Sequence, residues 1–275
     1  MFDNNSRILL TGGTGSFGTK FVEILLEKYP CIGQICIFSR DELKQWDMRQ
    51  QYPESDFPEF RFFIGDVRDK ERLNRAFENI DYVIHSAAMK QVPACEKFPN
   101  QAFLTNVVGS NNIKNACLRF GVNKLVLLST DKAVHPVNTM GMTKALAEKV
   151  LVGDDVLLQD ELQVVITRYG NVLSSRGSVI PMFIPMIKAG RSLPITDVRM
   201  TRFLMSLEES TQLVDEAISN GKNGEILVRK QPSSDIMTLA ESLGRLLNVQ
   251  IQFHICGIRP GEKLNEQLVS DEEMF

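Results

Sequence analysis

The sequence predicts an α/β fold, in which a doubly wound parallel sheet is followed by a smaller, interleaved lobe in the C-terminal third. Strand-length apolar segments alternate with helix-length amphipathic segments through the first two thirds of the 275 residues, as in consecutive strand–helix–strand units. The strands are near-continuous runs of Val, Ile and Leu, as in Lys124–Leu128, and such runs are typical of strands buried on both faces. A glycine-rich turn after the first strand completes the pattern.

In chain order, strands are expected at residues 7–11, 34–39, 60–65, 82–86, 124–129 and 163–168. Helices are expected at residues 17–29, 71–77, 101–120 and 143–152. Beyond Asn171 the alternation loosens, and the expected elements are strands at 193–196, 225–229 and 250–255 and helices at 207–220 and 237–247. We therefore expect two domains: residues 1–172 around the parallel sheet, and residues 173–275 as a lobe that partly returns to that sheet.

The composition limits the class of protein. Apolar residues make up 43% and charged residues 24%, which is ordinary for a globular enzyme, and the net charge of −3 gives no strong attraction to nucleic acid. The longest apolar runs are too short for a membrane span, and the N-terminus lacks the layout of a secretion signal. The five cysteines are odd in number and lack metal-ligand spacing. We therefore expect a cytoplasmic protein with reduced thiols and no metal.

Gly12, Gly15 and Gly18 lie directly between a predicted strand and a predicted helix. Glycine lets the backbone approach a pyrophosphate, whose charge then faces the N-terminus of the helix. In this context the spacing predicts a Rossmann-like fold with a dinucleotide site in residues 1–172. The turn residues expected to contact the cofactor are Gly12, Thr14, Gly15, Ser16, Phe17 and Gly18.

The tip of the second predicted strand favours NADP over NAD. Ser39 and Arg40 offer a hydroxyl and a guanidinium suited to a 2′-phosphate, whereas an acidic residue there favours the ribose hydroxyl of NAD. Asp41 would bind that ribose if the strand ended one residue later, so NAD is the second choice. The other residues expected to contact the cofactor are Lys44, Asp66, Val67, Ala87, Lys90 and Lys144.

A second group of residues follows the strand at 124–129: Thr130, Asp131 and Lys132, and then Met140 and Lys144. With the glycine turn they resemble the extended short-chain dehydrogenase/reductase family, in which Tyr-x-x-x-Lys is usual where this chain has Met140-x-x-x-Lys144. Within that family the chain looks like the inverting UDP-N-acetylglucosamine 4,6-dehydratases of bacterial capsule, O-antigen and flagellin-sugar synthesis, whose capsular branch has methionine there. The resemblance runs nearly end to end, through residues 39–42, 65–69, 88–93, 129–133, 168–172, 175–179, 200–203 and 259–263.

The resemblance implies a reaction on a UDP-sugar that is redox-neutral overall. Hydride leaves sugar C4 for NADP, the 4-keto group acidifies the C5 proton, water is lost from C6, and hydride returns to C6. The matching residues imply that Lys132 is the base for C5 and Asp131 the acid for the C6 hydroxyl. Because Met140 takes no proton, we hypothesise a relay from the C4 hydroxyl through Thr130, a water and Lys144 or Lys132.

A UDP-sugar carries two phosphates and a uracil, so the second lobe is expected to supply cations and hydrogen-bonding groups. Arginines in loop-like settings suit this task because the guanidinium fork matches a pyrophosphate. The residues that match the resembled substrate motifs are Lys90, Asn171, Arg176, Gly177, Ser178, Val179, Arg202, Arg259 and Glu262.

Two alternative functions stay open. A UDP-hexose 4-epimerase of the same fold, acting on UDP-glucose or UDP-N-acetylglucosamine, also oxidises C4 but needs no acid–base pair for dehydration. A non-catalytic NADP-binding module predicts cofactor binding without binding of a UDP-sugar. Members of the resembled group form dimers or larger rings, so a homo-oligomer is expected.

Overall fold

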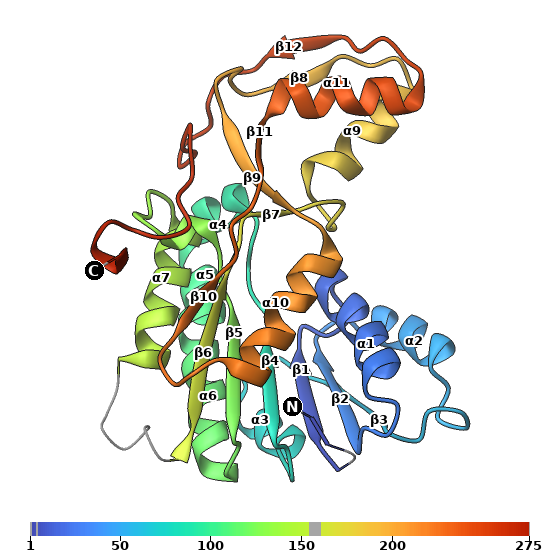
Figure 1. Cartoon of the computed structure of the whole chain (residues 1–275), viewed down its shortest axis with the longest axis vertical. Helices are drawn as coiled ribbons and strands as arrows, with labels where there is room; N and C mark the ends of the chain where they lie inside the picture. Colours follow the sequence, from blue (N-terminus) through green and yellow to red (C-terminus); the bar gives the residue numbers. More distant parts are fainter. Residues whose placement is uncertain (1, 4, 154–160, 275) are drawn as a thin grey trace.

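The computed structural model describes residues 2–3, 5–153 and 161–274. Its centre is a sheet of seven strands in the order β10-β6-β5-β4-β1-β2-β3, and all neighbouring strands are parallel (Figure 1). The predicted parallel α/β sheet is therefore confirmed. The strands are β1 (Arg7–Thr11), β2 (Gln34–Ser39), β3 (Phe60–Ile64), β4 (Tyr82–His85), β5 (Lys124–Leu128), β6 (Gln163–Arg168) and β10 (Ile226–Val228).

Helices cover both faces of this sheet, and the strands alternate between two cores. In β5, Val126 and Leu128 join one apolar cluster, whereas Leu125 and Leu127 join the other, as the two-residue period of a strand requires. The first cluster takes residues from α1 (Ser16–Lys28), α2 (Glu42–Gln51) and α10 (Leu207–Asn220), and the second from α3 (Lys70–Ala76), α6 (Gly109–Phe120) and α7 (Thr139–Val152). Burial on both faces explains the continuous apolar strands.

The single helix predicted at 101–120 is divided in the structure. It begins as α5 (Pro99–Phe103), directly after the short α4 (Val92–Lys97), passes through a π-helical turn (Leu104–Val108) and continues as α6. The buried side chain of Asn106 lies in the π turn, accepts from the backbone nitrogen of Met89 and donates to Oγ1 of Thr143. These bonds tie the loop after β4 to α7, and π turns frequently mark functional sites.

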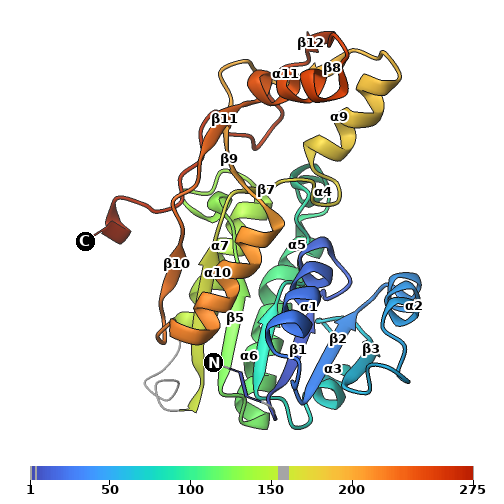
Figure 2. The ribbon, with the colours of Figure 1, turned by 45° about the vertical axis from the view of Figure 1, so that its right-hand side comes forward.

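The lobe of the C-terminal third lies above the carboxyl ends of the strands (Figures 1 and 2). It contains a three-stranded sheet, a two-stranded sheet and two helices that pack on an apolar core of their own. Its elements are β7 (Asn171–Val172), α9 (Val179–Lys188), β8 (Leu193–Ile195), β9 (Thr201–Met205), β11 (Ser233–Asp235), α11 (Ile236–Leu247) and β12 (Phe253–Ile255).

Between these elements, α10 and β10 return to the main sheet, where β10 pairs with β6. The domain boundary at residue 172 stays a prediction. The longer elements that were not predicted are α2, in which Gln45 and Met48 are the only buried residues, and α9, which contains Pro185. The short helix α4, the short strands β7, β9 and β11 and the 3-10 turns at Asp131–Ala133 and Glu272–Met274 were not predicted either. Within the described ranges, no helix is long and apolar enough to cross a membrane.

Candidate active site

The glycine turn joins β1 to α1 where the strand order reverses between β1 and β4. Gly12 has a φ of +68°, and a Cβ there would lie 2.9 Å from the backbone nitrogen of Ala87. A Cβ on Gly18 would lie 2.3 Å from the carbonyl oxygen of Gly13. No side chain caps α1 at Gly15, so the first amides of the helix face outward as donors for an anion. The turn therefore fits a dinucleotide pyrophosphate.

A cavity of about 330 Å³ lies beside this turn. It is lined by Ser16 of the turn and by Arg176 of the loop between β7 and α9. The backbone nitrogen of Arg176 donates to Oγ of Ser16 over 3.0 Å, and the carbonyl of Gly177 accepts from Nε2 of Gln91 over 3.2 Å. The loop that carries predicted substrate residues thus contacts the predicted cofactor turn directly.

The tip of β2 presents one exposed cation. Ser39 is buried, and its hydroxyl accepts from Nε2 of Gln45 over 3.0 Å. The Arg40 side chain is 58% exposed and lies 3.5 Å from Asp66. Asp66 is also held by Arg68, whose guanidinium donates to both carboxylate oxygens. Arg40 is therefore accessible to a 2′-phosphate, whereas the carboxylate of Asp66 already has a partner.

Two other predicted cofactor residues serve the structure itself. The Asp41 side chain caps α2 by accepting from the backbone nitrogen of Lys44 over 3.1 Å and also pairs with the Lys44 ammonium. This pairing holds the pKa of Asp41 below its usual value. Of the other residues predicted to contact the cofactor, Val67 is buried in the apolar cluster that includes residues of α3, α6 and α7, whereas Lys90 is exposed. Cofactor contacts by these four residues stay predictions.

Thr130, Asp131 and Lys132 form the turn that follows β5. The Asp131 side chain is fully buried, and its Oδ1 accepts from Oγ1 of Thr130 over 2.8 Å and from Nζ of Lys132 over 2.9 Å. Its backbone nitrogen donates to the carbonyl of Tyr169 over 3.1 Å, which fixes the turn to the end of β6. Oδ2 of Asp131 is buried and has no partner among the described residues. The structure therefore brings the predicted acid and base together and leaves one buried carboxylate oxygen without a hydrogen-bond partner among the described residues.

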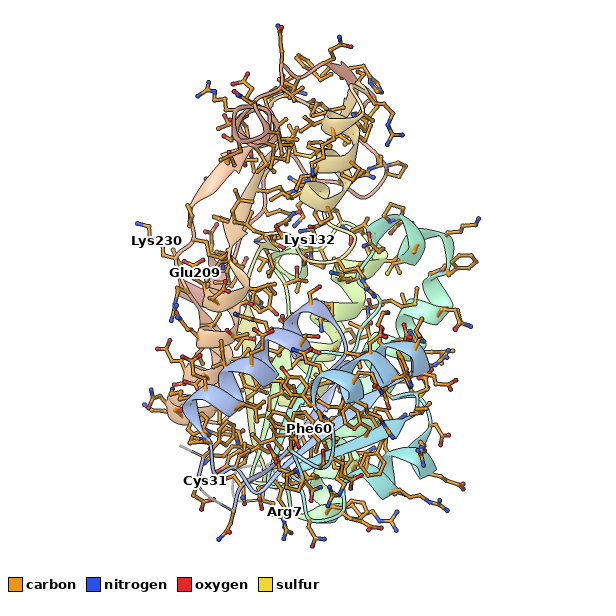
Figure 3. The ribbon with its side chains drawn as sticks, turned by 90° about the vertical axis from the view of Figure 1, so that its right-hand side faces the viewer. Arg7, Cys31, Phe60, Lys132, Glu209 and Lys230 are labelled. Carbon is orange, nitrogen blue, oxygen red and sulfur yellow. The ribbon has the colours of Figure 1, made fainter. Side chains whose placement is uncertain are left out.

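Lys132 lies at the junction between the main sheet and the lobe (Figure 3). Besides Asp131, its ammonium approaches Oδ1 of Asn171 at 3.4 Å and Oε1 of Glu266 at 3.8 Å. Its side chain is 16% exposed, and that of Glu266 is 2% exposed. Asn171 was predicted to bind substrate, but Glu266 was not singled out from the sequence.

Lys144 is buried on α7, one turn after Met140. Its Nζ donates to the carbonyl of Leu128 over 2.6 Å. Burial lowers the pKa of Lys144 to about 8, although the nearby charge of Glu148 acts in the opposite direction. Met140 is also buried, in a small apolar cluster that includes Cys95. Lys144 is therefore an amine that gives up its proton more readily than an exposed lysine.

The start of α7 lies against the backbone of the turn after β5. Asn138 caps the helix by accepting from the backbone nitrogen of Gly141 over 2.7 Å, and its Nδ2 donates to the carbonyl of Gly261 over 2.7 Å. A Cβ on Gly141 would lie 2.2 Å from the carbonyl oxygen of Lys132. Only glycine lets the helix approach the turn this closely.

The remaining predicted substrate residues form no hydrogen bond with the Asp131–Lys132 turn within the described part of the chain. Arg202 is buried, and its Nη1 donates to the carbonyls of Thr201 and Lys263. Arg259 pairs with Glu262 in a turn. Arg202 thus fixes the C-terminal segment, and the pyrophosphate contact predicted for it stays a prediction. Ser178 and Val179 begin α9, where the buried hydroxyl of Ser178 has no partner within the described residues.

A largely buried ion-pair network centred on Arg168 was not predicted from the sequence. The Arg168 guanidinium donates to Oε1 and Oε2 of Glu148, at 3.0 and 2.6 Å, and to both oxygens of Glu273, at 2.8 and 2.7 Å. Glu148 also accepts from the hydroxyl of Ser129. The position of Glu148, one helical turn after Lys144, was a signal, but the partner Glu273 lies 105 residues from Arg168 and no local pattern joins them.

The glycine turn at the β1–β4 switch point, with Lys144 buried beside the end of β5, defines a dinucleotide-dependent enzyme of the extended short-chain dehydrogenase/reductase class. Residues 8–275 match the model of the family described as polysaccharide biosynthesis protein, and the chain belongs to this family. It is 47% identical over 270 residues to a protein of Rickettsia canadensis named UDP-glucose 4-epimerase, covering 97% of this chain and 78% of that protein. A protein of the same name from Rickettsia akari is 46% identical over 270 residues, with the same coverage.

Two solved structures share the fold. Pen from Bacillus thuringiensis superposes with a TM-score of 0.91 and 36% identity, over 98% of this chain and 82% of Pen. DesIV from Streptomyces venezuelae, a dTDP-glucose 4,6-dehydratase with NAD and TYD bound, gives a TM-score of 0.85 and 23% identity, over 97% of this chain and 89% of DesIV. At that identity the second likeness shows the fold alone.

Proposed function

We propose that this chain is a UDP-N-acetylglucosamine 4,6-dehydratase that inverts C5 and makes a 4-keto-6-deoxy sugar for a bacterial surface polysaccharide. The observation that carries the proposal is the pair formed by Asp131 and Lys132, with 2.9 Å between Oδ1 and Nζ and with Oδ2 unpartnered. Dehydration needs an acid and a base next to each other, and simple oxidation and reduction at C4 do not.

The pair reaches its reactive form without an outside proton. At rest the ion pair is a carboxylate and an ammonium. Transfer of one proton across the contact gives a carboxylic acid and a neutral amine with the same total charge. The amine of Lys132 can then take the C5 proton, and the acid of Asp131 can protonate the departing C6 hydroxyl. A closed, weakly solvated site favours this transfer because burial disfavours the charged forms of both groups.

When bound, NADP would supply the hydride chemistry at C4 and C6. Arg40 supports the choice of NADP because it is the exposed cation at the tip of β2. The glycine turn and the uncapped start of α1 would hold the pyrophosphate. Lys144 would bind the nicotinamide ribose through the donors that its bond to the Leu128 carbonyl leaves over.

The proton of the C4 hydroxyl needs a route that avoids Met140. Thr130 hydrogen-bonds Asp131 and lies beside Lys132, and the pKa of Lys144 near 8 makes that amine a proton acceptor near neutral pH. A relay through Thr130 and a water to Lys144 or Lys132 is our hypothesis for this step. A Met140→Tyr variant that oxidises C4 much faster, measured by cofactor absorbance in a single turnover, would support it, and an unchanged rate would contradict it.

UDP-glucose 4-epimerase is the second candidate, and the names of the Rickettsia relatives favour it. Such an enzyme also oxidises C4 but then turns the ketose over in the site and reduces it from the other face. It gives no role to the acid of Asp131. The site therefore favours the dehydratase and the relatives' names favour the epimerase, and the two candidates share the cofactor site and the first chemical step.

Proton NMR of the purified protein with UDP-N-acetylglucosamine and catalytic NADP in deuterated water separates the candidates. A new C6 methyl signal, with deuterium at C5 and an inverted ring, is expected for the dehydratase. Conversion to the galacto isomer without a methyl signal, there or with UDP-glucose, would identify an epimerase and reject the dehydratase. Tight NADP binding without turnover of either sugar would instead identify a non-catalytic module.

A further inference from the structure

Glu266 is a buried carboxylate that the reaction proposed above does not use. It comes from the segment after β12, and its side chain is 2% exposed. Oε1 lies 3.8 Å from Nζ of Lys132, and Oε2 lies 3.3 Å from Nζ of Lys263. Oε2 forms no hydrogen bond within the described part of the chain. A buried carboxylate is unfavourable unless it is paired, so these two lysines explain why it is tolerated.

The four groups form one alternating row of charges: Asp131, Lys132, Glu266 and Lys263. Nζ of Lys263 also donates to the carbonyl of Val134 over 2.7 Å, which fixes the end of the row to the turn after β5. Two carboxylates and two ammonium groups cancel, so the row as a whole is neutral. The electrostatic potential at the Lys132 ammonium group therefore depends on both Glu266 and Lys263.

We propose that Glu266 is a positioning residue for Lys132: together with Lys263 it holds the amine beside Asp131 and sets how readily that amine loses its proton. The inference rests on the proposed role of Lys132 as base. The Glu266 carboxylate favours the ammonium form of Lys132, and the Lys263 ammonium weakens that influence. Other charged groups of the neighbouring elements are engaged elsewhere or exposed: Lys144 with the Leu128 carbonyl, Glu148 with Arg168, Arg202 with the carbonyls of Thr201 and Lys263, and His135 at the surface.

Two substitutions move the proton affinity of Lys132 in opposite directions if this is right. Glu266→Gln keeps the shape but removes the negative charge, so Lys132 should become a free amine at lower pH, by about one pH unit. Lys263→Met removes the opposing positive charge, so Lys132 should become a free amine at higher pH. A loosened structure would shift both variants in the same direction.

The measurement is competitive acetylation of the whole protein with acetic anhydride across pH, without substrate, with the Lys132 peptide quantified by mass spectrometry. Glu273→Gln is the matched control, because it weakens another ion pair of the same C-terminal segment and leaves Glu266 in place. Opposite shifts in Glu266→Gln and Lys263→Met, with none in Glu273→Gln, support the proposal. Equal shifts, or none, overturn it.

The product analysis described above is independent of this test. Labelling reports on Lys132 in the free protein, whereas NMR reports on the reaction. An epimerase whose Lys132 responds as expected would reject the dehydratase but keep the pairing with Glu266. A dehydratase whose Lys132 does not respond would do the opposite. In a dehydratase, the alkaline limb of kcat/KM should also move to lower pH in Glu266→Gln, and Glu266→Asp, which restores the charge, should move it back.

Discussion

A single methyl group at Gly141 tests whether the close approach of α7 to the turn after β5 is needed. In Gly141→Ala the new Cβ would lie 2.2 Å from the carbonyl oxygen of Lys132. Since carbon and oxygen atoms rarely come closer than about 3.3 Å, the helix and the turn must separate by about 1 Å. Alanine in a helix otherwise stabilises by about 1 kcal/mol relative to glycine, and the clash costs about 1–3 kcal/mol.

We therefore expect the free energy of unfolding to fall by about 1 kcal/mol, the difference of these two effects. The acid–base pair is carried on the displaced turn, and a misplacement of about 1 Å reduces a rate by about a hundredfold. Urea denaturation measures the first quantity, and turnover of the UDP-sugar identified by NMR measures the second. The affinity for NADP should fall much less than the rate, because Gly12 and Gly18 lie on a different loop and only the proposed Lys144 contact to the nicotinamide ribose is carried on α7.

Met142→Ala is the control, since this neighbour on the same helix is 52% exposed and shortening its side chain creates no clash with the backbone. It should leave both quantities near those of the unsubstituted protein. A Gly141→Ala protein that is more stable than the parent and equally active would show that the turn has room for the methyl group, and would refute the reasoning.

Three further outcomes are expected. Gly18→Ala should lower both the free energy of unfolding and the affinity for NADP, because its Cβ would lie 2.3 Å from a carbonyl oxygen. In the control Gly15→Ala the nearest atom is 3.2 Å away, so the free energy of unfolding in urea should change little. Equal loss of stability in both variants would contradict this. Arg40→Ala should weaken binding of NADP about tenfold in calorimetry and leave NAD unaffected. Glu273→Gln should lower stability at pH 7 by about 1 kcal/mol; because the Arg168 guanidinium lowers the pKa of Glu273 from 4.5 to about 2, this difference is present above pH 4.5 and should disappear as the pH falls toward 2.

Patterns that are local in the sequence predicted most of the main sheet. The six strands expected in the first two thirds are all present, because short continuous apolar runs are typical of strands in a sheet that is buried on both faces. The polar helix α2 escaped prediction because it buries only Gln45 and Met48 and so shows little periodicity. The π turn also escaped, since it depends on bonds from Asn106 to residues outside its own helix.

The candidate site divides in the same way. The glycine turn and the Asp131–Lys132 pair lie within short segments with recognisable spacing, and the structure brings the latter pair into contact. Glu266 and Glu273 were missed because Lys132 and Arg168, which they approach, are more than a hundred residues away, and a lone glutamate carries no signal of its own. The arginines were predicted from their loop-like settings and their match to the resembled motifs, neither of which reveals that Arg202 donates to backbone carbonyls.

The long sequence separation of the contacts made by the C-terminal segment also bears on the order in which parts of the protein fold. The atoms that a Cβ on Gly12 or Gly18 would meet all belong to the first ninety residues, but the bond from Lys263 to Val134 spans 129 residues and that from Arg168 to Glu273 spans 105. Contacts of such long range form late, since loop closure has to precede them. A chain emerging from the ribosome can therefore form its glycine turn well before the bonds around Lys132 are made, so the proposed pyrophosphate site is expected to form before the site that processes a sugar.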